Sequence, residues 1–236
     1  MLIRNAKTFN TGLVLAISFV GVLLLIFSPV FGGKNGLEYS DDLFNKLSKG
    51  SSYFISTVAE HNKKFVGTQL TVSVKLDKPE TVEKAQKLLI AAGALVGAKD
   101  TELKINGDLG KILLAVLKDS DDMYKNEGSS LVSRYGFSET DVMTVWWNVL
   151  KLTVKPLQKD KKIEDANMIM EVLQKAVEPA FNYYKIPAES VASKAGTMTG
   201  LLVFYVMYTM WWGYAIFYMF DGLGLSMKKA KVKKEV

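Results

Sequence analysis

The stretches TGLVLAISFVGVLLLIFSPVF, residues 11–31, and MTGLLVFYVMYTMWWGYAIFYMF, residues 198–220, decide the fold of this chain. Neither stretch contains Asp, Glu, Lys, Arg or His. A helix needs about 20 apolar residues to cross the ~30 Å hydrocarbon core of a bilayer, and each stretch has that length. The sequence therefore predicts a membrane protein with two transmembrane helices, at residues 11–31 and 198–220.

The net charge of +6 is concentrated near the two ends of the chain. Residues 32–197 contain 23 Lys and Arg against 22 Asp and Glu, so the middle is close to neutral. The stub at residues 1–10 carries Arg4 and Lys7, and residues 221–236 carry a basic run. Because loops rich in Lys and Arg stay in the cytoplasm, we expect both termini to be cytoplasmic and residues 32–197 to be extracytoplasmic. The expected location is the inner membrane of a bacterium.

The basic run after the second span can bind anionic lipid headgroups, since each Lys near a membrane surface contributes about 1 kcal/mol. Its lysines are Lys228, Lys229, Lys231, Lys233 and Lys234. Simple anchoring of the second span explains the run equally directly, and we favour it over specific lipid recognition. Nucleic acid is not an expected partner, because the middle domain has no basic stripe.

The first apolar segment also has features of a secretory signal peptide, namely a basic start, an apolar run and the small residues Gly32 and Gly33. Its length and its Ser28-Pro29 end fit a spanning helix that stops at an interface. We therefore expect an uncleaved anchor.

Few residues of this chain can carry chemistry. There is no Cys and only one His, which excludes disulfides, thiolate metal sites and a haem held by two histidines of this chain. No motif for a nucleotide, zinc-protease or serine-hydrolase site occurs. Asp119-Ser-Asp121-Asp122 resembles the start of a calcium loop, but Met123 holds the next ligand position, which favours a solvated helix end. We predict no catalytic residue, no metal site and no cofactor.

Two groups of side chains leave an enzymatic alternative open. His61 lies at the polar end of a predicted helix, where a solvated or capping role is more common than that of a general base. Ser193 and Lys194 are a candidate Ser/Lys pair, although a Lys just before a span commonly reaches to the interface. An enzyme that acts on lipid is the least favoured class.

The middle of the chain predicts a mainly α-helical α+β domain. Residues 69–76 alternate between apolar and polar side chains and predict a strand, and residues 101–106 predict a second one. Between them a helix is expected from Pro79 to about Gly97. If the two strands pair directly in parallel, this connection should be a right-handed crossover. Two strands make a poor sheet alone, which suggests that another chain completes it.

Helical spacing dominates the rest of this domain. A helix is expected from Leu37 to Phe65 with a kink near residues 49–52. Ser138 begins a capping box for an almost entirely apolar helix at residues 142–157, which contains Trp146 and Trp147. That helix is either the central core helix or one that lies against a membrane or a partner.

The last part of the domain predicts two further helices. Residues 163–184 show one apolar face, and Pro179 is expected to bend this helix. Pro187 starts another, and nothing between it and Met198 requires an end. We therefore expect one continuous helix from Pro187 through the second span.

Aromatic residues straddle the centre of the second span, whereas Tyr and Trp normally gather at membrane interfaces. They are Tyr205, Tyr208, Trp211, Trp212 and Tyr214. A phenolic hydroxyl without a partner in lipid costs on the order of 1–3 kcal/mol. We expect at least one side of this helix to face protein, a quinone-like ligand or a lipid headgroup; simple tolerance of aromatics in an apolar helix is the alternative. Gly196 and Gly200 have the spacing of a dimerisation face.

These features predict a non-enzymatic accessory or scaffold subunit of a larger integral membrane complex. Its partners would be other membrane subunits, copies of itself or membrane lipids, contacted through the aromatic span, Trp146 and Trp147. A homo-oligomeric protein of the polysaccharide co-polymerase type, or a ligand sensor, has a similar two-span layout, which is a likeness of topology alone.

Overall fold

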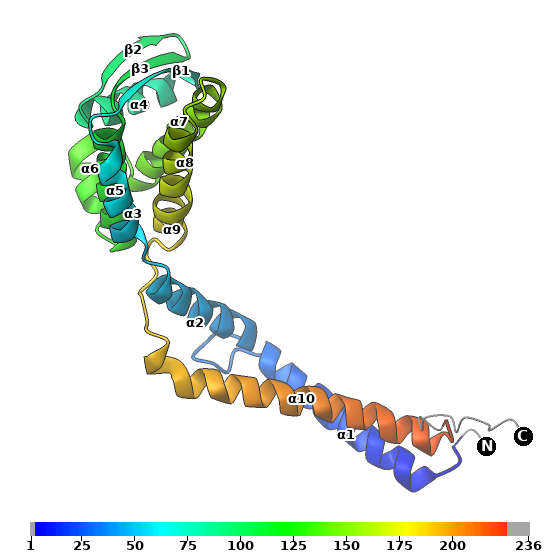
Figure 1. Ribbon diagram of the computed structural model, residues 1–236. Helices are drawn as coiled ribbons and strands as arrows, with labels where there is room; N and C mark the ends of the chain where they lie inside the picture. Colours follow the sequence, from blue (N-terminus) through cyan, green and yellow to red (C-terminus); the bar gives the residue numbers. More distant parts are fainter. Residues whose placement is uncertain (1–2, 226–236) are drawn as a thin grey trace, which may run out of the picture. The chain divides into compact units, whose positions relative to one another are not determined.

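The computed structural model describes residues 3–225 (Figure 1). The chain forms two compact units, one from residues 1–47 with residues 189–236 and one from residues 48–188. Two helices of the first unit, α1 (Ala6–Phe27) and α10 (Ala195–Gly222), are long and apolar enough to cross a membrane. They overlap the predicted spans at residues 11–31 and 198–220 and begin five and three residues earlier, which is in keeping with a membrane protein.

Local chemistry sets the ends of α1. The Asn5 side chain accepts a hydrogen bond from the Thr8 N–H at 3.2 Å and so caps the first turn. At the other end, the Ser28 hydroxyl donates to the Leu25 carbonyl at 2.7 Å. Pro29 follows, and a proline has no N–H with which to continue the helical ladder.

α1 and α10 pack side by side in antiparallel directions. The N–H groups of Arg4 and Asn5 both donate to the Gly222 carbonyl at 2.9 Å, which holds the start of α1 beside the end of α10. Gly12 is buried in this contact, where a Cβ would lie 2.8 Å from the Ala215 carbonyl oxygen. Small residues allow such close approach between membrane helices.

The segment before α10 differs from the predicted continuous helix that starts at Pro187. A short 3₁₀ helix occupies Ala192–Lys194, and α10 begins only at Ala195. The reason is local, because the Ser190 hydroxyl accepts a hydrogen bond from the Ser193 N–H at 3.2 Å. Serine side chains that bond the backbone in this way compete with helix formation.

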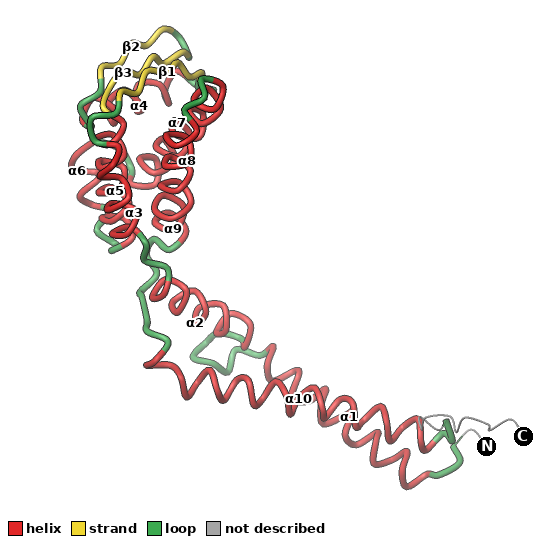
Figure 2. The backbone as a smooth tube through the Cα atoms, in the orientation of Figure 1, coloured by secondary structure: helices red, strands yellow, loops and turns green. Residues whose placement is uncertain are grey.

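The second unit combines helices with a small sheet (Figure 2). Its helices are α3 (Ile55–Asn62), α4 (Pro79–Ala91), α5 (Leu109–Tyr124), α6 (Ser129–Tyr135), α7 (Glu139–Lys159), α8 (Ile163–Val172) and α9 (Glu178–Asn182). Its strands are β1 (Gln69–Lys75), β2 (Leu95–Lys99) and β3 (Glu102–Asp108). The helix that precedes α3, α2 (Gly36–Ser51), lies mostly in the first unit, and the predicted kink near residues 49–52 is a complete break between these two helices.

The sheet is antiparallel, with the strand order β1-β3-β2. β1 pairs with β3 from Gln69 opposite Asp108 to Lys75 opposite Glu102, and β2 pairs with the other edge of β3. The two predicted strands therefore pair directly, but in antiparallel directions, so the rule for a parallel crossover does not apply. The sequence prediction missed β2 because its residues continue the apolar spacing of α4. Gly93, with φ of 84°, provides the left-handed turn that ends this helix early.

On each of the two predicted strands, alternate side chains are apolar and face the core. Leu70, Val72 and Val74 of β1 are buried, as are Leu103 and Ile105 of β3. Helices α4, α5 and α7 contact this sheet. Three strands packed on helices are enough for a stable sheet, so no second chain is required to complete it.

The helices that follow begin and bend for identifiable reasons. The Ser138 hydroxyl accepts a hydrogen bond from the Asp141 N–H at 3.2 Å, which confirms the predicted N-terminal cap of α7. A turn of π-helix at Leu173–Val177 joins α8 to α9 directly before Pro179. The wider turn accommodates a residue that lacks an N–H and would clash with the carbonyl of Lys175. The predicted bend thus takes the form of a π turn.

Replacing Gly12 by Leu is expected to destabilise the α1–α10 pair by about 1–3 kcal/mol, because the side chain would collide with α10. Gly21→Leu is the matched control, since no atom lies within 4 Å of a Cβ at that position. Thermal unfolding of the full chain in detergent measures the difference. Equal melting temperatures for the two variants would contradict the observed packing.

Candidate interaction surfaces

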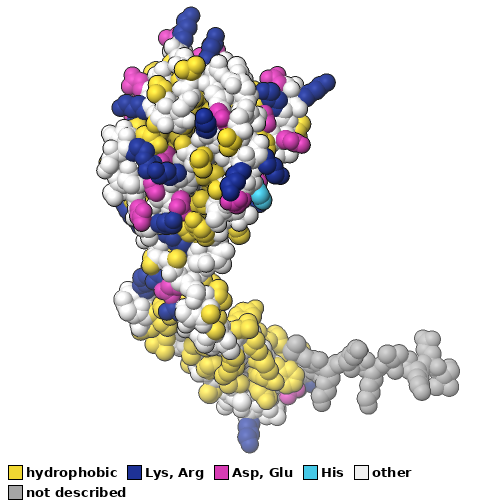
Figure 3. All heavy atoms as spheres, turned by 60° about the vertical axis from the view of Figure 1, so that its left-hand side comes forward, with side chains coloured by type: hydrophobic (Ala, Val, Ile, Leu, Met, Phe, Trp, Pro, Cys, Tyr) yellow, Lys and Arg dark blue, Asp and Glu magenta, His cyan; other side chains and the backbone are white. Residues whose placement is uncertain are grey.

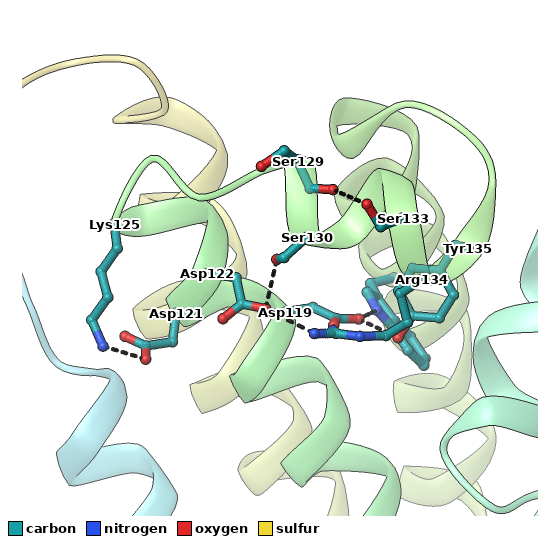
Figure 4. Close-up of polar contacts among 10 residues, drawn as sticks. Asp119, Asp121, Asp122, Lys125, Ser129, Ser130, Ser133, Arg134 and Tyr135 are labelled. Atoms are coloured by element: carbon teal, nitrogen blue, oxygen red, sulfur yellow. Dashed lines mark hydrogen bonds and ion pairs between the residues drawn. The ribbon is translucent and has the colours of Figure 1, made fainter.

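A buried carboxylate of the second unit contacts side chains of two neighbouring helices (Figure 4). Asp119 of α5 is only 1 % exposed. Its side chain accepts hydrogen bonds from the Trp146 indole N–H and the Tyr135 hydroxyl, each at 2.8 Å, and from the Arg134 guanidinium. Buried charges are tolerated when they are paired and hydrogen-bonded in this way. The network therefore has a structural role in joining α5, α6 and α7.

The same region corrects the prediction of a solvated helix end at Asp119–Asp122. Burial raises the pKa of Asp119, against the opposing effect of its hydrogen-bond donors and of Arg134. Arg134 also donates to Asp122 at 3.0 Å, so only the rim of this cluster is solvated. Among residues 3–225, no group of three His, Cys, Asp or Glu side chains is placed to hold a metal ion.

A second buried charge joins the beginning and the end of this unit. Lys49 is 3 % exposed, and its ammonium donates to Asn126 Oδ1 at 2.9 Å, the Tyr183 carbonyl at 3.0 Å and the Ile186 carbonyl at 2.7 Å. Burial lowers the pKa of Lys49. The Tyr124 hydroxyl donates to the Lys49 carbonyl in turn. These bonds tie the segment that enters the unit to the segment that leaves it.

The residues of the enzymatic alternative are engaged in local contacts. His61 Nδ1 lies 3.1 Å from Glu171 Oε1 on the surface of the second unit. In the first unit, the Ser193 hydroxyl donates to the Ser190 carbonyl at 2.7 Å, and Lys194 pairs with Glu189 at 3.0 Å. Ser193 and Lys194 thus bond to other residues, and the structure does not bring them together as a catalytic pair.

Three of the five aromatic residues predicted as contacts in α10 face α1. The Tyr208 ring stacks on Phe19 with 4.1 Å between centroids, and the Trp212 ring lies 4.8 Å from Phe19. The Trp211 indole donates to the Leu15 carbonyl at 3.1 Å. Much of the aromatic centre of this span is therefore explained by its pairing with α1.

The other two aromatic residues point outward from the helical pair. Tyr205 is 63 % exposed and Tyr214 is 51 % exposed. Within the described part of the chain, neither hydroxyl has a hydrogen-bond partner, and the buried Tyr208 hydroxyl also lacks one. Hydrophobic side chains cover most of the surface of the α1–α10 pair in Figure 3, whereas charges of both signs are scattered over the second unit.

The two neighbouring tryptophans of α7 have different environments. Trp146 is fully buried and bonded to Asp119, so it takes the core position that the sequence left open for this helix. Trp147 is only partly buried and lies at the surface between α7 and the α8–α9 helices. The candidate contact residue of this helix is therefore Trp147 alone.

Two hollows adjoin Trp147, and we call them together the Trp147 groove. The hollow on one side has a volume of about 250 Å³ and the hollow on the other about 300 Å³. The first is lined by Met143, Thr144, Trp147, Val177, Glu178, Phe181 and Asn182. The second is lined by Trp147, Lys151, Val154, Lys155, Gln158, Met170, Leu173 and Gln174. The π turn contributes to both walls, and π turns are frequent at functional sites.

A third hollow of about 580 Å³ lies between α3, α5 and the end of α4. Alanines form much of its floor, and Lys111 and Lys118 stand on its α5 side. It offers fewer large apolar side chains than the Trp147 groove. The predicted lipid-binding residues Lys228, Lys229, Lys231, Lys233 and Lys234 lie outside the described residues.

Trp146→Phe is expected to lower the free energy of unfolding by about 1–3 kcal/mol, because the buried Asp119 carboxylate loses one donor. Trp147→Phe removes an indole N–H in the same way from the adjacent residue. It is expected to change the free energy of unfolding by less than about 0.5 kcal/mol. Chemical unfolding of the full chain in detergent, followed by circular dichroism, measures both. Equal effects would argue against a structural role for the network.

Lys49→Met is expected to destabilise the fold by a similar amount, about 1–3 kcal/mol, because the buried ammonium and its three hydrogen bonds to Asn126, Tyr183 and Ile186 are lost. The change should also accelerate amide hydrogen exchange around Ile186. Lys175→Met, at a half-exposed lysine paired with Glu171, is the control and should have little effect. Unchanged exchange at Ile186 in the Lys49 variant would show that the hydrogen bonds of Lys49 are not needed to hold this segment.

No protein-family model, curated protein or solved structure matches this chain. The candidate interaction surfaces are therefore those that its own residues form, namely the exposed part of α10 and the Trp147 groove.

Proposed function

We propose that this protein is a non-enzymatic accessory or scaffold subunit of a larger membrane complex. Its spans anchor it, and its second unit binds a partner protein. In this proposal both termini are cytoplasmic and the second unit lies outside the cytoplasm of a bacterial cell, in accord with the distribution of basic residues. The partners are other integral membrane subunits or further copies of this chain.

The Trp147 groove is the observation that carries this proposal. Phe181 is 45 % exposed and Met170 is 37 % exposed, and both line the same groove as Trp147. Aromatic residues and Met are enriched in protein interfaces, where large side chains in hollows supply most of the binding energy. Polar groups that are buried elsewhere in the unit, such as Asp119 and Lys49, are already occupied by internal bonds.

The part of α10 that α1 leaves exposed supports the same proposal from within the membrane. Tyr205 and Tyr214 are both exposed, and because they are nine residues apart they lie on opposite flanks of the helix. Partner helices with suitable acceptors on either flank would remove the cost of leaving these hydroxyls unpaired. A complex that contacts both the spans and the second unit would use both surfaces.

A homo-oligomer is the second candidate, and the open glycine face of α10 favours it. No atom lies within 4 Å of a Cβ built at Gly196 or Gly200, so another helix has room to approach there. In this case the partner would be a copy of the same chain.

The test is the size and composition of the particle extracted from native membranes in a mild detergent. We expect a complex that contains other membrane subunits and that is weakened by Trp147→Ala or by the pair Tyr205→Leu and Tyr214→Leu. Val132→Ala, at a 39 % exposed residue of α6, is the control and should leave the complex intact. Recovery of a lone monomer would overturn the proposal, and a particle made only of this chain would support the homo-oligomer.

A further inference from the structure

We infer that the Trp147 groove binds an amphipathic helix of a partner protein whose polar side carries carboxylates. This inference rests on the proposed function and specifies the chemistry of the partner. It follows from the length of the groove, from its apolar lining and from the charges at its two ends.

The groove has the dimensions of a helix-binding site. On α7 its lining extends from Met143 to Gln158, which corresponds to about 22 Å at the rise of an α-helix. The opposite wall runs back from Phe181 to Met170. A partner helix of about four turns would lie along this length and place apolar side chains in the hollows on either side of Trp147.

The charges on the groove are distributed unevenly. Lys151 and Lys155 line one end, and both are exposed. Neither forms an ion pair with any acidic residue in the part of the chain that the structure describes. Glu178 stands at the other end. A partner helix with carboxylates opposite the two lysines would satisfy this pattern.

The positive charge of Lys151 lies close to the apolar surface of Trp147. Its ammonium lies 5.4 Å from the centroid of the Trp147 ring. It therefore stays at the rim of the groove, where a carboxylate of the partner can reach it while the ring packs against apolar side chains. Charge at the rim of an interface contributes mainly to selectivity and to the rate of association.

Tryptophan and lysine also occur together on surfaces that bind anionic membranes. Such surfaces insert protruding side chains into the headgroup layer. Here the apolar side chains line hollows of about 250 and 300 Å³, and Trp147 is partly buried between them. A concave site of this kind accommodates a helix, so lipid binding is the competing outcome in the test.

The experiment uses the full chain in nanodiscs of phosphatidylcholine and a fluorescent, stapled 18-residue helical peptide. One face of the peptide carries Leu and Phe, and its flanks carry Glu; in the matched peptide every Glu is replaced by Lys. We expect the acidic peptide to bind at least about tenfold more tightly than the basic one. Trp147→Ala should weaken the acidic peptide by at least about tenfold. Empty nanodiscs correct for binding to lipid.

Charge reversal provides the specific test. Lys151→Glu with Lys155→Glu should reverse the preference, so that the basic peptide binds more tightly. The control pair Lys111→Glu and Lys118→Glu makes the same change of charge at the hollow on α5 and should leave the preference unchanged.

Equal binding of both peptides, or reversal by the control pair, would overturn the inference. So would competition by vesicles that contain phosphatidylserine, provided the competition is lost in the Lys151/Lys155 variant, because the groove would then be a lipid site. In each of these cases an intact complex in native membranes would leave the proposed function standing.

Discussion

The buried carboxylate of Asp119 is the interaction on which the second unit depends. This one side chain of α5 accepts hydrogen bonds from α6, through Arg134 and Tyr135, and from α7, through Trp146. Any donor left unpaired in this core would cost about 1–3 kcal/mol, so the network strongly favours a single arrangement of the three helices. The same bond holds Trp146 in the core, and the adjacent Trp147 lies at the surface.

Patterns that repeat along the chain were sufficient to predict much of the fold. The two uncharged segments predicted the positions of α1 and α10, and the alternation at residues 69–76 predicted β1. The cap of α7 at Ser138 could be predicted because a serine hydroxyl and an N–H three residues later interact locally. In each case the physical cause lies within a few residues, where a single sequence records it.

Features that depend on distant partners could not be predicted in the same way. β2 is an exposed edge strand. It is a strand because it pairs with β3 in antiparallel directions, and its own residues do not predict this. Asp119 was assigned to solvent because it is charged. Yet it follows Ile112 and Val116 at helical spacing and precedes Met123 by four residues, which places it on the apolar face of α5. A charged residue on the apolar face of a helix, such as Asp119, indicates a buried hydrogen-bond network.

The surroundings of individual aromatic residues could not be predicted from the sequence either. Successive residues of a helix point about 100° apart, so in a pair of neighbouring tryptophans the two side chains face different surroundings. In α7, Trp146 is fully buried and Trp147 opens onto a groove. In α10, both tryptophans contact α1, Trp211 through the Leu15 carbonyl and Trp212 through the Phe19 ring. Sequence composition treats the members of each pair as equivalent. Only the packing of the neighbouring helices decides that one tryptophan of α7 stabilises the fold and the other is available to a partner, whereas both tryptophans of α10 pack on α1.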